Sequence, residues 1–67
     1  MNIVLNNRNE IFEQEQLTIR ELLTLKKYSF KLLVIKVNGE LVRLRDYDST
    51  LVKDGDDVMI LHLITGG

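Results

Sequence analysis

The stretch that decides the fold is KLLVIKVNGELVRL, residues 31–44. Asn38-Gly39 in its middle is a strong hairpin signal, because both central positions of a type I′ turn need positive φ. Residues 31–37 before the turn are apolar on both sides in their middle, which is typical of a largely buried strand. Residues 40–44 after it form the returning strand. The stretch therefore predicts a β-hairpin with one largely buried strand.

A second hairpin is predicted at the start of the chain. Residues 1–5 contain β-branched side chains and alternate with a period of two, which indicates a strand. Residues 6–9 are a cluster of turn formers, and residues 10–14 can return as a second strand.

One helix is predicted to begin at Thr18. Thr18 and Glu21 have the spacing of a capping box, in which each side chain accepts a hydrogen bond from the other residue's backbone N–H. Ile19, Leu22 and Leu23 then form an apolar stripe, and Lys26-Lys27 follows at the negative end of the helix dipole. At roughly ten residues this helix is marginal alone, so it must pack on a sheet.

The last third of the chain predicts a loop, a turn and a final strand. Residues 45–51 show no clear period and fit a loop with one helical turn, and residues 53–56 form a turn. Residues 58–63 are an apolar strand. The order of elements predicts an α+β protein with a mixed sheet of four or five strands and one main helix on one face. This is the ubiquitin-like β-grasp arrangement.

The sequence ends in Gly66-Gly67 after the apolar strand. Glycine is about 7% of average usage, so this pair occurs at a given end by chance about once in two hundred chains. Glycine loses the most entropy on ordering and is poorly suited to fixing an end. We therefore expect residues 1–63 to form one globular domain and residues 64–67 to be a mobile tail, with the Gly67 carboxylate as the functional group.

The composition excludes several classes of function. The chain has 67 residues, 45% of them hydrophobic and 28% charged, which is the balance of a folded protein. It has no cysteine, so it can form neither a disulfide nor a thiolate metal site. A formal net charge of −1 with scattered basic residues argues against nucleic-acid or membrane binding. Without a long apolar run or a signal-peptide pattern, a cytoplasmic protein is expected.

The length and order of elements, together with three motifs, resemble the ThiS family of sulfur carriers in thiamine biosynthesis. The motifs are residues 37–42, the Lys53-Asp54-Gly55-Asp56 turn and the Gly-Gly tail. The molybdopterin-synthase small subunit, MoaD, shares this fold and tail. ThiS proteins often carry a Pro-Arg pair where this chain has Arg43-Leu44. The alternatives are that Arg43 takes the place of that arginine, that Arg45 does, or that its role is absent from this chain.

The resemblance implies a protein co-substrate and not an enzyme. A ThiF-type adenylating enzyme, related to the ubiquitin-activating E1 enzymes, would use ATP to adenylate the Gly67 carboxylate. Sulfur from a donor would then displace AMP and leave a thiocarboxylate, which would pass its sulfur to a ThiG-type thiazole synthase. The chain has no phosphate-binding loop, so we expect ATP to be bound by the partner and expect no cofactor here.

The final strand is apolar at both its odd and its even positions, which face opposite sides, and this predicts a docking surface. If Val58 and Ile60 face the helix, Met59, Leu61 and Leu63 face outward, where methionine supplies an adaptable surface. The alternative is a central strand covered by its neighbours' side chains. The residues expected to bind partners are Met59, Leu61, Leu63, Ile64, Thr65, Arg43 and Arg45.

Other polar residues favour structural interpretations. His62 is the only histidine and cannot build a metal site alone. Asp54, Asp56 and Asp57 lack the spacing of an EF-hand, and turn chemistry around Gly55 explains them better.

Two alternatives remain for the function. One is a molybdopterin-synthase small subunit, although those proteins are usually somewhat longer than this chain. The other is a ubiquitin-like protein modifier or interaction module. A modifier would form isopeptide bonds to lysines, whereas a sulfur carrier would not.

Overall fold

The computed structural model describes residues 1–28 and 32–63. Within them the chain forms seven strands, one α-helix and one short 3₁₀ helix. In chain order these are β1 (Asn2–Leu5), β2 (Arg8–Ile11), β3 (Gln16–Thr18), α1 (Ile19–Leu25), β4 (Leu33–Val37), β5 (Glu40–Val42), η1 (Leu44–Asp46), β6 (Leu51–Lys53) and β7 (Asp57–His62).

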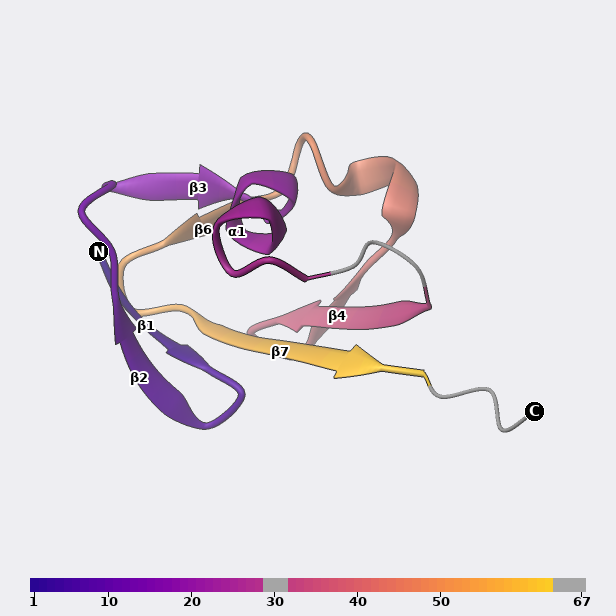
Figure 1. Cartoon of the computed structure of the whole chain (residues 1–67), viewed down its shortest axis with the longest axis horizontal. Coiled ribbons are helices and arrows are strands. Elements are labelled where there is room, and N and C mark those ends of the chain that lie inside the picture. Colours follow the sequence, from indigo (N-terminus) through magenta and orange to yellow (C-terminus); the bar gives the residue numbers. More distant parts are fainter. Residues whose placement is uncertain (29–31, 64–67) are drawn as a thin grey trace.

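The main sheet has five strands in the order β2-β1-β7-β4-β5. β1 and β7 run parallel, and the other neighbouring strands are antiparallel. Helix α1 lies on one side of this sheet, with β3 and β6 beside it (Figure 1). The predicted mixed sheet with one main helix on one face is therefore confirmed, and the arrangement is the ubiquitin-like β-grasp.

The two β-hairpins of the sheet turn at Asn6-Asn7 and at Asn38-Gly39. All four residues have a positive φ, from 50° at Asn6 to 84° at Gly39, as tight two-residue turns require. In the first hairpin Leu5 pairs directly with Arg8, so the returning strand begins earlier than predicted. It covers Arg8–Ile11, and the prediction of a strand over residues 10–14 was wrong.

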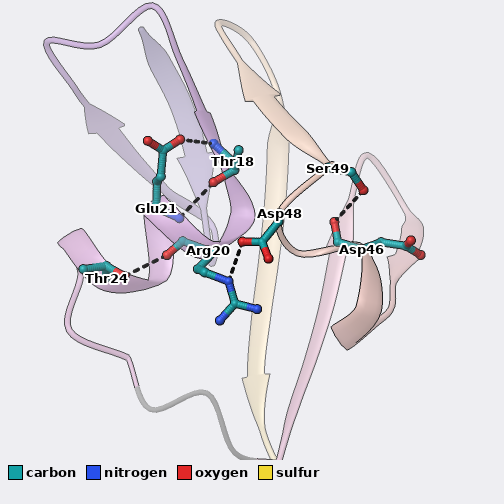
Figure 2. Close-up of polar contacts among 7 residues, drawn as sticks. All are labelled: Thr18, Arg20, Glu21, Thr24, Asp46, Asp48 and Ser49. Carbon is teal, nitrogen blue, oxygen red and sulfur yellow. Dashed lines mark hydrogen bonds and ion pairs between the residues drawn. The ribbon is translucent and has the colours of Figure 1, made fainter.

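Helix α1 begins with the predicted capping box. The Glu21 backbone N–H donates to Thr18 Oγ1 at 3.1 Å, and the Thr18 N–H donates to Glu21 Oε1 at 2.9 Å (Figure 2). The helix has seven residues, fewer than predicted, because Lys26 forms the C-cap and Lys27 turns to a φ of 60°. Its stripe of Ile19, Leu22 and Leu23 is completely buried.

A second, two-stranded sheet pairs β3 with β6 and was not predicted. Leu17 lies opposite Val52, and both side chains are buried. Residues 45–51 do contain the predicted turn of helix, which begins one residue earlier, at Leu44.

The hydrophobic core lies between the helix, the inner face of the main sheet and the β3–β6 pair. Each fully buried aliphatic side chain contributes about 1.5–3 kcal/mol of transfer free energy. The buried residues of this core are Ile3, Leu5, Leu17, Ile19, Leu22, Leu23, Ile35, Val42, Tyr47, Val52, Val58 and Ile60.

Candidate functional site

β7 is the central strand that leads to the end of the chain, and its two faces differ sharply. Val58 and Ile60 point inward and are buried. Met59 and Leu61 point to the opposite face, where Met59 is half-buried and Leu61 is 51% exposed. Side chains alternate between the two faces of a strand. The apolar residues of β7 therefore contribute alternately to the core and to the outer surface.

The outer surface continues across β4 and β5. Lys36 lies opposite Met59, and Val34 lies opposite Leu61. On the other side of β4, Leu41 lies opposite Lys36 and is 55% exposed. We call this surface the outer face; its residues on these three strands are Val34, Lys36, Leu41, Met59 and Leu61.

Two grooves border this face, and the second also reaches the core residues Val42 and Tyr47. The first, of about 410 Å³, is lined by Val34, Lys36, Gly39, Asp57, Met59 and Leu61. The second, of about 370 Å³, is lined by Leu32, Leu33, Val34, Leu41, Val42, Arg43, Leu44 and Tyr47. Val34 borders both grooves, so they are neighbouring parts of one apolar surface, with Lys36 in its middle on β4 and Arg43 at its edge.

The structure brings together some of the sequence-predicted site residues and separates others. Arg43 follows β5 and lines the second groove, whereas Arg45 lies in η1, next to Asp46, and lines neither. Leu63 follows β7, is 51% exposed, and donates its backbone N–H to Leu32 O at 2.7 Å. The predictions for Ile64, Thr65, Gly66 and Gly67, including the mobile tail, lie outside the described residues.

Sequence reasoning missed four residues that extend this surface: Val34, Lys36, Leu41 and Leu44. Residues 33–37 are apolar except for Lys36, so the sequence alone does not distinguish the two faces of this strand. Only the register between β4 and β7 shows that Val34 and Lys36 share the face of Met59 and Leu61.

The acidic residues near Gly55 form a structural turn cluster. The Asp56 carboxylate accepts from the Lys53 N–H at 2.8 Å and from Asn38 Nδ2 at 3.0 Å, while Asp54 accepts from the Asn2 N–H at 2.7 Å. Gly55 has a φ of 87°. Among residues 1–28 and 32–63, no three His, Cys, Asp or Glu side chains are grouped to hold a metal ion.

His62 ends β7 and is exposed. Its ring centroid lies 5.4 Å from that of Tyr28. Within the described parts of the chain, no helix has the length and apolarity needed to cross a membrane.

Comparisons with known proteins agree with the fold. The model of the ThiS family matches residues 2–67. A crystal structure of the thiamine biosynthesis protein ThiS from Geobacter metallireducens is 33% identical, with a TM-score of 0.89 and full coverage of both chains. A solution NMR structure of a thiamine biosynthesis protein from the same organism is also 33% identical, with a TM-score of 0.83, covering all of this chain and 88% of the other. No curated protein sequence matches significantly. The family match spans nearly the whole chain and the fold agrees throughout, so this chain belongs to the ThiS family.

Proposed function

We propose that this chain is a sulfur carrier for formation of the thiamine thiazole. The observation that carries the proposal is the ThiS family match, which extends through Gly66 and Gly67, together with the thiamine biosynthesis proteins that share the fold at 33% identity. In this role the chain is a co-substrate whose reacting group is the Gly67 carboxylate.

The chemistry requires activation, because a carboxylate carbonyl is electron-rich and oxide cannot leave. A Gly67 carboxylate oxygen attacks the α-phosphate of ATP held by a ThiF-type activating enzyme, and pyrophosphate leaves. A sulfur nucleophile from the donor then attacks the acyl carbon, and AMP departs with the carbon–oxygen electron pair. The resulting thiocarboxylate delivers sulfur to a ThiG-type thiazole synthase. Neither glycine has a Cβ, so the acyl carbon is open to attack.

The outer face is the proposed docking surface for these enzymes. Leu41, Leu61 and Leu63 are each at least half exposed, so a partner that covers them removes apolar area from water. The same surface is continuous with the end of β7, so docking there places a partner beside the start of residues 64–67. Lys36 within this surface and Arg43 at its edge favour acidic side chains on the partner.

The experiment is an activation assay read by intact mass. The chain is incubated with ATP, a sulfur donor and the activating enzyme from the same organism. Its intact mass and its fragments are then measured by mass spectrometry. We expect one sulfur-for-oxygen exchange located at Gly67. Lysine conjugates would identify a modifier instead, and an unchanged mass with an enzyme that is active on its own carrier would overturn the proposal.

Deletion of Gly67 is the matched variant. We expect it to abolish the exchange and to leave the thermal unfolding midpoint nearly unchanged, because chain ends add little to a core. Sulfur transfer to thiazole synthase, compared with transfer to a molybdopterin-synthase large subunit, then separates the two pathways.

A further inference from the structure

β1 runs parallel to β7 but stops before β7 does. The register pairs Val4 with Asp57 and Leu5 with Val58, and the chain then enters the Asn6-Asn7 turn. Among residues 1–28 and 32–63, no strand therefore lies beside β7 on this side from Met59 onward. The Ile60 N–H, which faces this side, needs another partner, because an unpaired polar group in a partly buried place costs free energy.

Asn6 supplies that partner with its side chain. Its backbone N–H donates to Val58 O at 2.9 Å, as the next residue of a parallel strand would. In a continued ladder its main-chain carbonyl would then accept from the Ile60 N–H. At Asn6 the chain has instead turned to a φ of 50°, and the side-chain Oδ1 accepts from the Ile60 N–H at 2.7 Å. The side-chain carbonyl thus replaces the main-chain carbonyl.

The same side chain reaches the segment after the helix. Asn6 Nδ2 donates to the Tyr28 hydroxyl at 3.4 Å, and the Tyr28 ring lies against the His62 ring at the end of β7. Asn6 therefore connects to β7 directly at Ile60 and through Tyr28 at His62.

The opposite edge of β7 is held by ordinary backbone pairing. Leu33 pairs with His62, and the Leu63 N–H donates to Leu32 O at 2.7 Å. The end of β7 is thus fixed by β4 on one side and by the Asn6 side chain on the other. We propose that Asn6 is a positioning residue that fixes the end of β7, and with it the starting point of residues 64–67, for the activating enzyme. This inference rests on the proposed sulfur-carrier function.

Three variants isolate the Asn6 side chain from the turn it belongs to. Asn6→Gly removes the side chain and still accepts positive φ. Asn7→Gly is the matched control, because Asn7 has a φ of 67° in the same turn and its side chain has no hydrogen-bond partner among the described residues. Asn6→Asp keeps an oxygen that accepts from the Ile60 N–H, and Tyr28 can donate to the new carboxylate.

Two measurements test the proposal. Amide hydrogen exchange at Ile60, followed by NMR, should be at least about fivefold faster in Asn6→Gly than in Asn7→Gly, as loss of one hydrogen bond implies. The KM for activation should rise about three- to fivefold in Asn6→Gly with kcat nearly unchanged, because the lost contact supports ground state and transition state alike. Asn6→Asp should restore both values.

The outcomes separate this inference from the proposed function. Equal Ile60 exchange in the two glycine variants, or equal KM values at a temperature where both are fully folded, overturns the role of Asn6. If the wild-type chain is never thiocarboxylated, the sulfur-carrier proposal falls and the role in activation falls with it. The exchange measurement still decides whether the Asn6 side chain holds the end of β7.

Discussion

Tyr47 is a tyrosine whose surroundings change its acidity. Its side chain is 3% exposed in the core, and burial raises the pKa of its hydroxyl above the ordinary value of 10.0, while the nearby Arg20 guanidinium offsets part of that shift. A tyrosine hydroxyl keeps its proton below its pKa. As long as Tyr47 is protonated in both the folded and the unfolded chain, it does not make stability depend on pH. Above the unfolded-state pKa the unfolded chain loses the proton first, and stability falls as pH rises.

We therefore expect the urea midpoint of the wild-type chain to fall between about pH 9 and about pH 11. Tyr47→Phe keeps the buried ring and removes the titrating hydroxyl, so its midpoint should fall less over the same interval. Chemical unfolding at several pH values measures both slopes. An identical alkaline loss in the two proteins would show that other groups cause it.

Single residues also show where sequence reasoning works and where it ends. The Asn38-Gly39 turn was predicted, because its signal is two adjacent residues with a local conformational preference. The hydrogen bond from the Ile60 N–H to Asn6 could not be predicted, because its partners lie 54 positions apart and meet only where β1 ends beside β7. Asn6-Asn7 was interpreted as turn chemistry alone, since both residues favour turns.

At the scale of elements, α1 depends on its first turn. The helix has seven residues, so the reciprocal hydrogen bonds of Thr18 and Glu21 satisfy a large share of its free N–H groups. Thr18→Ala should lower the free energy of unfolding by about 1 kcal/mol. Thr24→Ala is the control on the same helix. Within the described residues the exposed Thr24 hydroxyl donates only to Arg20 O, and alanine favours helix. Urea unfolding compares them, and equal losses would contradict a special role for the cap.

The elements that were missed are short. β3 and β6 have three residues each, too few for a period of two to stand out from chance. In their pairing Leu17 lies opposite Val52, which is 35 positions away in the sequence. Such a contact depends on the tertiary fold and not on local sequence. The helix was predicted because its capping box and apolar stripe are local signals that agree with each other.

At the scale of the molecule, the outer face is a product of strand order. The sequence showed that residues 58–63 have two apolar sides, and the exposure of Leu61 and Leu63 places one of them at the surface. It could not show which strands flank β7, because β4 and β1 come from distant parts of the chain. The contributions of Val34, Lys36 and Leu41 therefore appeared only with the fold.

The central strand and one edge strand of the sheet allow a matched test of docking. Leu61 is 51% exposed on β7, and Ile11 is 82% exposed on the edge strand β2. The register places both on the same face of the sheet, since Ile11 pairs with Asn2 and Val4 pairs with Asp57. Both positions are partly open to water, so replacing either by aspartate should change the free energy of unfolding by a similar, small amount.

Binding should separate the two variants. If partners dock over the end of β7, Leu61→Asp buries a charge against an apolar surface and should weaken binding of the activating enzyme at least about tenfold. Ile11→Asp lies two strands away, about 10 Å across the sheet, and should bind within about twofold of wild type. Calorimetric titration of the enzyme with each variant measures the difference. A larger effect at Ile11 would move the docking surface from β7 to the β2 edge, and equal weakening would show that docking is not centred on the end of β7.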